Sequence, residues 1–78
     1  MLNSLMKVIQ NRYKFMVEDM NEDYDLLVQS DGQDSKFDTN MVWINDIIEQ
    51  CNEEPNENNL DLAVACIIKE ELIIENQK

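Results

Sequence analysis

The most hydrophobic stretch of the chain runs from residue 60 to residue 74. In a helix that turns about 100° per residue, the apolar side chains of 62–68 point in every direction, and a helix that is apolar all round belongs in a core. Val64 and other β-branched residues leave a buried strand as the alternative, but the length of the stretch favours a helix. We therefore predict a central helix here, capped at its start by Asn58 or Asn59.

The first 20 residues carry apolar side chains at intervals of three and four, which predicts an amphipathic helix over 1–20. The main stripe consists of Leu2, Leu5, Met6, Ile9, Tyr13, Met16, Val17 and Met20. Met1, Val8 and Phe15 lie seven residues apart and form a second, smaller stripe beside it. The apolar surface is therefore wide, and these three residues are candidates for contact with a second subunit in a homodimer.

The helical pattern is interrupted between residues 22 and 38. Tyr24, Leu26 and Val28 alternate with Asp25, Leu27 and Gln29, which is a passable strand pattern. Asp31 and Gly32 form a strong hairpin-turn signal. We predict a short two-stranded hairpin in this region. An irregular loop is the alternative, because the returning arm is poor in β-favouring residues.

A second helix is predicted from a cap at Asp38 or Thr39 to about Asn52. Its apolar stripe consists of Met41, Ile44, Ile47, Ile48 and Cys51, with Trp43 at the edge. Pro55 lies in the polar connector that follows and prevents one continuous helix, because proline lacks a backbone N–H and clashes with the preceding turn. The predicted order is thus helix, hairpin or loop, helix, helix.

These elements and the length of 78 residues predict one compact, mainly α domain, 1–78, in which the last helix is central. An α+β fold is the alternative if the predicted hairpin forms. A chain of this length has a small core, so a partner or a second copy would add to its stability.

The chain has 17 acidic and 6 basic residues, and its net charge is −11. A surface of this sign repels nucleic acids and anionic membranes and attracts basic proteins. The charge is also unevenly distributed, because residues 1–17 contain Lys7, Arg12 and Lys14 but no acid. We therefore expect the first helix to dock against the acidic body of its own chain or of a neighbour.

Two acidic clusters are candidates for a partner-binding face. One consists of Glu18, Asp19, Glu22 and Asp23, and the other of Asp46, Glu49, Glu53, Glu54 and Glu57. Solubility alone is the alternative explanation, but it usually requires a net charge of only about 2–8. Trp43 lies beside the second cluster and is a candidate binding hot spot or, alternatively, a core residue.

Enzyme chemistry, metals and cofactors are not expected. The chain contains no histidine, only one glycine and two cysteines, so it lacks the usual neutral-pH base, a phosphate-binding glycine loop and a zinc ligand set. An EF-hand counted from Asn21 fails, because Leu26 stands where glycine is required. We interpret Cys51 and Cys66 as two small core side chains, with a redox pair as the alternative.

No secretory leader pattern opens the chain, and no apolar run reaches the length of a membrane span. We expect a soluble protein of the cytoplasm, and a phage gene expressed in a bacterial host is one source of such a chain.

The second half of the chain carries a Phe, a Trp-Ile-x-Asp segment, an acidic run, a Pro, an Asn four residues later and a closing apolar helix. The residues of this pattern are Phe37, Trp43, Ile44, Asp46, Pro55, Asn59, Ala65 and Glu70. The pattern resembles the small acidic adaptors of bacterial iron–sulfur cluster assembly, the IscX type, although the Trp-to-Pro spacing is one residue longer and residues 1–36 do not match. The resemblance implies an adaptor that docks onto a basic cysteine desulfurase.

The leading hypothesis for function is a non-enzymatic inhibitor or nucleic-acid mimic that acts on a basic protein. Size and charge are typical of phage and mobile-element counter-defence proteins, including anti-CRISPR and anti-restriction proteins. The alternatives are the iron–sulfur adaptor and a homo-oligomerising structural module.

Overall fold

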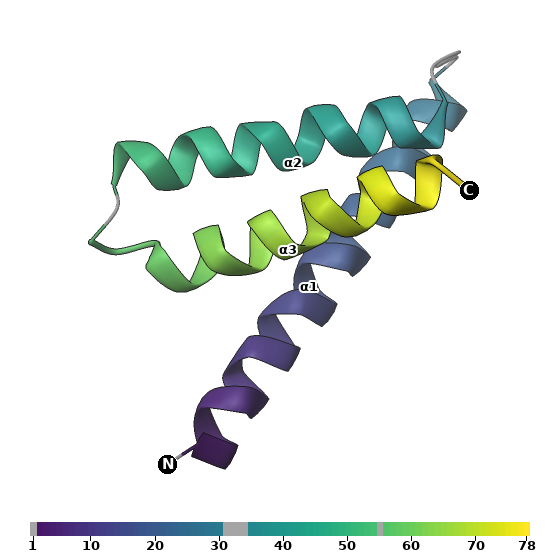
Figure 1. The fold of residues 1–78 in the computed structure, drawn as a ribbon. Helices are drawn as coiled ribbons and strands as arrows, with labels where there is room; N and C mark the ends of the chain where they lie inside the picture. The colour runs from purple at the N-terminus through teal and green to yellow at the C-terminus, as the bar shows by residue number, and fades with distance from the viewer. Residues whose placement is uncertain (1, 31–34, 55) are drawn as a thin grey trace.

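The computed structural model describes residues 2–30, 35–54 and 56–78, which form three helices: α1 (Leu2–Gln29), α2 (Lys36–Glu53) and α3 (Asn59–Asn76). Helices α2 and α3 lie side by side in opposite directions, and α1 crosses them at an angle (Figure 1). The N-terminal end of α1 extends away from the other two helices. The prediction of a mainly α fold is confirmed.

The core lies where the three helices meet. Its buried residues are Met16 and Met20 from α1, Ile44 from α2, and Val64, Ala65 and Ile68 from α3. The contact between α2 and α3 is the most extensive. The contact between α1 and α3 is smaller, and that between α1 and α2 is the smallest. The last helix is therefore central, as predicted.

Only one face of α3 is buried, so the expectation of a helix buried all round is wrong. Ile68 is 2% exposed, whereas its neighbour Ile67 is 45% exposed. Cys66 and Ile74 are also exposed. The physical reason is that two partner helices cover only one side of a third, which leaves its outer face in contact with solvent.

Residues Tyr24 to Val28 belong to α1, so the predicted strand is wrong. A helical stripe continues from Met20 through Tyr24 to Leu27, at intervals of four and three, and all three side chains are at least half-buried. The alternation read as a strand used Val28 instead, which is exposed. The predicted turn at Asp31 and Gly32 lies outside the described residues.

Helix α2 begins one turn before the predicted caps. Ser35 is its N-cap, and the Ser35 Oγ accepts a hydrogen bond from the Asp38 backbone N–H at 3.1 Å. Asp38 and Thr39 therefore lie within the first turn. The predicted apolar stripe of α2 is confirmed, since Ile44 and Cys51 are buried.

One polar residue was not expected in the core. Asn40 is 3% exposed, and its Oδ1 has no hydrogen-bond partner among the described residues. It lies four residues before Ile44, on the same face of α2.

Asn58 is the N-cap of α3, but its side chain does not cap the helix. The Asn58 Nδ2 instead donates a hydrogen bond to the backbone carbonyl of Glu54 at 3.2 Å, across the connector. Cys51 is buried and Cys66 is exposed, and both thiols are free. The prediction of two core cysteines is therefore wrong for Cys66.

Within residues 2–30, 35–54 and 56–78, no helix combines the length and the apolar character that crossing a membrane requires.

Candidate functional site

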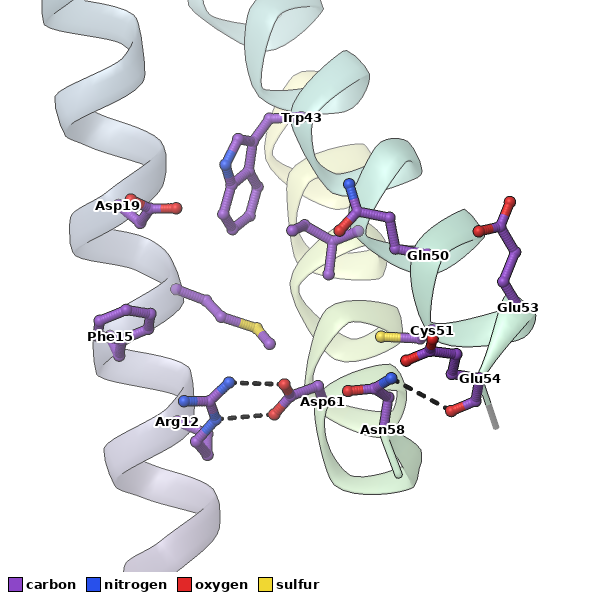
Figure 2. Close-up of a pocket in the computed structure, with 12 residues that line it drawn as sticks. Arg12, Phe15, Asp19, Trp43, Gln50, Cys51, Glu53, Glu54, Asn58 and Asp61 are labelled. Carbon is purple, nitrogen blue, oxygen red and sulfur yellow. Dashed lines mark hydrogen bonds and ion pairs between the residues drawn. The ribbon is translucent and has the colours of Figure 1, made fainter. Parts of the chain in front are cut away.

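A groove with a volume of about 410 Å³ lies between α1 and α2 and reaches the start of α3 (Figure 2). We call it the α1–α2 groove. Its lining residues are Arg12, Phe15, Met16, Asp19, Trp43, Ile47, Gln50, Cys51, Glu53, Glu54, Asn58 and Asp61. Apolar and aromatic side chains are thus combined with carboxylates in one concave surface.

Helical spacing explains why these side chains share the groove. Helix α1 contributes residues 12, 15, 16 and 19, and α2 contributes 43, 47, 50, 51 and 53. Each residue lies three or four positions from another member of its set, so each set lies on one side of its helix. Met41 and Ile48, on another side of α2, pack against the core, and the groove residues Trp43 and Ile47 also contact it.

Arg12 is held by an ion pair across the groove. Its Nε donates to Asp61 Oδ1 at 2.7 Å and its Nη2 donates to Asp61 Oδ2 at 2.6 Å, so the pair is bidentate. The guanidinium also lies 5.3 Å from the ring centre of Phe15. Because Arg12 is matched by Asp61, the carboxylates of Asp19, Glu53 and Glu54 leave the groove with an excess of negative charge.

Trp43 lies at the boundary between the core and the groove. The side chain is half-buried and packs against the core cluster, and it also lines the groove. In Figure 2 the indole extends from α2 into the space between the two helices, on the side of Asp19. The aromatic face of Trp43 and the carboxylate of Asp19 therefore lie in the same groove.

The other predicted acidic residues surround the groove without entering it. Asp46 and Glu49 are exposed on α2, Glu18 and Glu22 are exposed on α1, Asp23 is half-buried, and Glu57 is exposed in the connector. Glu57 also borders a shallow depression that Glu53 and Glu54 share. The structure thus brings Asp19, Glu53 and Glu54 together and leaves the rest on adjoining surfaces.

Few of these carboxylates are neutralised within the chain. Among the described residues, ion pairs involve only Asp61, with Arg12, and Glu75, with Lys78 at 3.5 Å. The docking of α1 against the acidic body of its own chain is confirmed for Arg12. Lys7 and Lys14 form no ion pair with any described residue.

Two side chains near the groove have shifted pKa values. Burial raises the pKa of the Cys51 thiol, and the negative charge of Asp61 acts in the same direction. The thiol at the groove floor therefore stays protonated and is a poor nucleophile. The Tyr13 hydroxyl donates a hydrogen bond to Glu71, and this bond, together with burial, raises the pKa of Tyr13.

The self-association candidates are divided in the structure. Val8 and Phe15 are both exposed on α1, and Met1 lies outside the described residues. Phe15 also borders the groove, which the heptad spacing alone did not indicate.

No cluster of three or more His, Cys, Asp or Glu side chains within the described ranges has the geometry to hold a metal ion. The pairs Arg12–Asp61 and Tyr13–Glu71 were missed by sequence reasoning. The first pair joins residues 49 positions apart, and the second joins residues 58 positions apart. The acid-free segment 1–17 was the one sign that basic side chains would meet acidic ones.

Comparison with known proteins finds no matching family model, no matching curated protein and no matching solved structure. The resemblance to iron–sulfur adaptors therefore rests on the residues quoted above.

Proposed function

We propose that this protein is an acidic protein-binding module that inhibits a nucleic-acid-binding protein by occupying its basic groove. The observation that carries the proposal is the α1–α2 groove, where Trp43 and Phe15 lie among carboxylates that no described cation neutralises, apart from Asp61. An arginine or lysine side chain of a basic partner would find an aromatic face and an opposite charge there.

The exposed side of α2 supports a nucleic-acid-like surface. Asp46, Glu49 and Glu53 are exposed at intervals of three and four residues. These intervals correspond to about 4.5–6 Å along a helix axis, whereas each DNA strand carries a charge about every 3.4 Å. A single row is therefore less densely charged than a DNA strand, and the carboxylates of α1 add a second row.

The net charge of −11 makes association fast and sensitive to salt. If apolar contacts dominated the complex, its affinity would not fall as salt is added. The aromatic groove residues are then expected to provide the short-range contacts, since tryptophan is enriched among binding hot spots.

The test starts from the basic proteins of a bacterial lysate that are retained on heparin. These are passed over the immobilised protein, and we expect one or more to be retained, eluted by salt and released by duplex DNA. Each retained protein is then purified, and its affinity is measured through the fluorescence of Trp43, the single tryptophan.

The decisive variant is Glu53→Gln combined with Glu54→Gln, which removes two groove carboxylates with little change in shape. We expect it to weaken binding at least tenfold. The matched control is Glu70→Gln combined with Glu75→Gln, which removes the same charge from exposed positions of α3. Equal losses from both variants would show that the acidity acts without a site. Retention that duplex DNA does not reverse would contradict mimicry and favour the adaptor hypothesis.

A further inference from the structure

One face of α1 presents large apolar side chains that stay exposed to solvent, with charged residues at the positions between them. Leu5, Val8, Phe15 and Leu26 are all exposed large apolar side chains, and Leu26 is 63% exposed. Residues 5, 8, 12, 15, 19, 22 and 26 follow one another in alternating steps of three and four. The four apolar residues occupy four of these seven positions. That alternation is the heptad spacing of a seam between two packed helices. We call these four residues the α1 seam.

Helix α1 is also longer than its partners. It has 28 residues, whereas α2 and α3 have 18 each, so it exceeds them by about 15 Å at a rise of about 1.5 Å per residue. The excess is seen at the N-terminal end, which extends past α3 (Figure 1). Leu5 and Val8 belong to the N-terminal part of α1, and their side chains are 53% and 44% exposed.

The charges along one flank of the seam are complementary to themselves. Lys7 and Lys14 are followed by Glu18 and Asp25 at intervals of seven, four and seven residues, so all four lie along one strip of α1. A parallel copy would place like charges opposite one another. An antiparallel copy places the basic half of one strip against the acidic half of the other.

We propose that a second copy of this chain packs its α1 antiparallel against the α1 seam, around a two-fold axis. In the register that places Val8 of each copy opposite Leu26 of the other, Phe15 faces Asp19, and Arg12, which is paired with Asp61 of its own chain, faces Glu22. A shallow depression of about 300 Å³ lies beside Leu26, lined by Glu22, Asp25, Leu26 and Gln29, and it accommodates the incoming Val8. Every contact occurs twice, because a two-fold interface uses the same surface on both subunits.

This inference does not rest on the proposed function, although Phe15 belongs to both the α1 seam and the α1–α2 groove. The seam lies on α1, whereas the exposed carboxylates of α2 stay free to meet a basic partner. The net charge of −11 on each copy opposes association, and salt screens that repulsion. We therefore expect the dimer to persist from about 0.1 M to about 0.5 M NaCl, unlike the charge-driven complex with a basic partner.

Sedimentation equilibrium tests the proposal on the full chain. At a concentration of about 100 µM we expect twice the chain mass of 9.2 kDa. Val8→Lys and Leu26→Lys should each weaken self-association at least tenfold, because each places a charge in the seam twice. Val42→Lys is the matched control, since Val42 on α2 is also 63% exposed but lies outside the seam. Circular dichroism of each variant verifies that the helices are retained.

Cross-linking tests the antiparallel register. Val8→Cys and Leu26→Cys are made separately in a Cys66→Ser background, which removes the exposed native thiol. With copper phenanthroline as oxidant, a mixture of the two variants should form disulfide-linked dimers, whereas each variant alone should form far fewer. A monomeric wild-type protein, an equal effect of Val42→Lys, or efficient cross-linking of Val8→Cys alone would each overturn the proposal.

Discussion

The contact between α2 and α3 and the contact of α1 with both differ in kind. Ile44, Val64, Ala65 and Ile68 join α2 and α3 through buried apolar side chains. Among the side chains that the structure describes, α1 contributes only Met16 and Met20 to the buried core. Flexible methionines adapt to irregular surfaces, whereas branched side chains specify one packing.

Polar pairs supplement the docking of α1. The bidentate pair of Arg12 with Asp61 and the hydrogen bond of Tyr13 to Glu71 both join α1 to α3 at partly exposed positions. The difference indicates that the α2–α3 contact provides most of the stability, while α1 is held by weaker interactions that depend on pH and salt.

The largest expected effect is in the α2–α3 core. Ile68→Ala should lower the free energy of unfolding by about 2–5 kcal/mol, because it leaves a cavity at a fully buried position. Ile67→Ala makes the same chemical change on the exposed side of the same helix and should cost less than about 1 kcal/mol. Urea denaturation measures both. Equal losses would show that α3 is covered on both sides.

A smaller effect is expected at the polar contact of α1. Asp61→Asn should lower the free energy of unfolding by about 0.5–1 kcal/mol, because the side chains of the pair are 37% and 27% exposed and solvent weakens their attraction. The loss should shrink as salt is added. Glu75→Gln breaks the fully exposed pair with Lys78 and serves as the control, with no measurable change expected. A salt-independent loss would contradict an electrostatic role for Asp61.

The smallest effect appears only at alkaline pH. The bond to Glu71 raises the pKa of Tyr13 above its ordinary value of 10.0, so the neutral phenol stabilises the folded state. This contribution is fully present below the pKa of the unfolded chain, and it is lost as the pH rises through the raised pKa of the folded state. Tyr13→Phe should therefore lose less stability than the wild type as the pH rises above about 10. Tyr24→Phe should keep the wild-type dependence, and identical profiles for Tyr13→Phe and wild type would contradict the assignment.

The periodicity of the sequence predicted helices where one stripe dominates. The stripe of α2 needed only its own spacing, and Ile44 and Cys51 are buried as expected. Residues 22–29 satisfied two periods at once, and the helical one prevailed because Tyr24 and Leu27 continue the stripe that begins earlier in α1. The choice depended on packing against other helices, which local spacing does not contain.

For the same reason, the sequence could not predict which residues of α3 are buried or which residues line the groove. Ile67 and Ile68 are chemically identical neighbours, so only the positions of the other helices decide which one is buried. The groove likewise unites Asp19 with Glu53 and Glu54, which are far apart in the sequence. Acidic clusters and Trp43 were recognisable as candidates, but their meeting in one concavity follows from the crossing of α1 over α2.

The two thiols differ in exposure, and this difference allows one of them to be labelled selectively with a spectroscopic probe. Cys51 is enclosed and Cys66 is accessible, so a maleimide dye should attach to Cys66 alone in the folded wild-type chain. Trp43 is the single indole and lies on α2, whereas Cys66 lies on α3. Energy transfer from the indole to the dye would then follow the spacing of the two helices and the environment of the groove in the same sample, with no engineered residue.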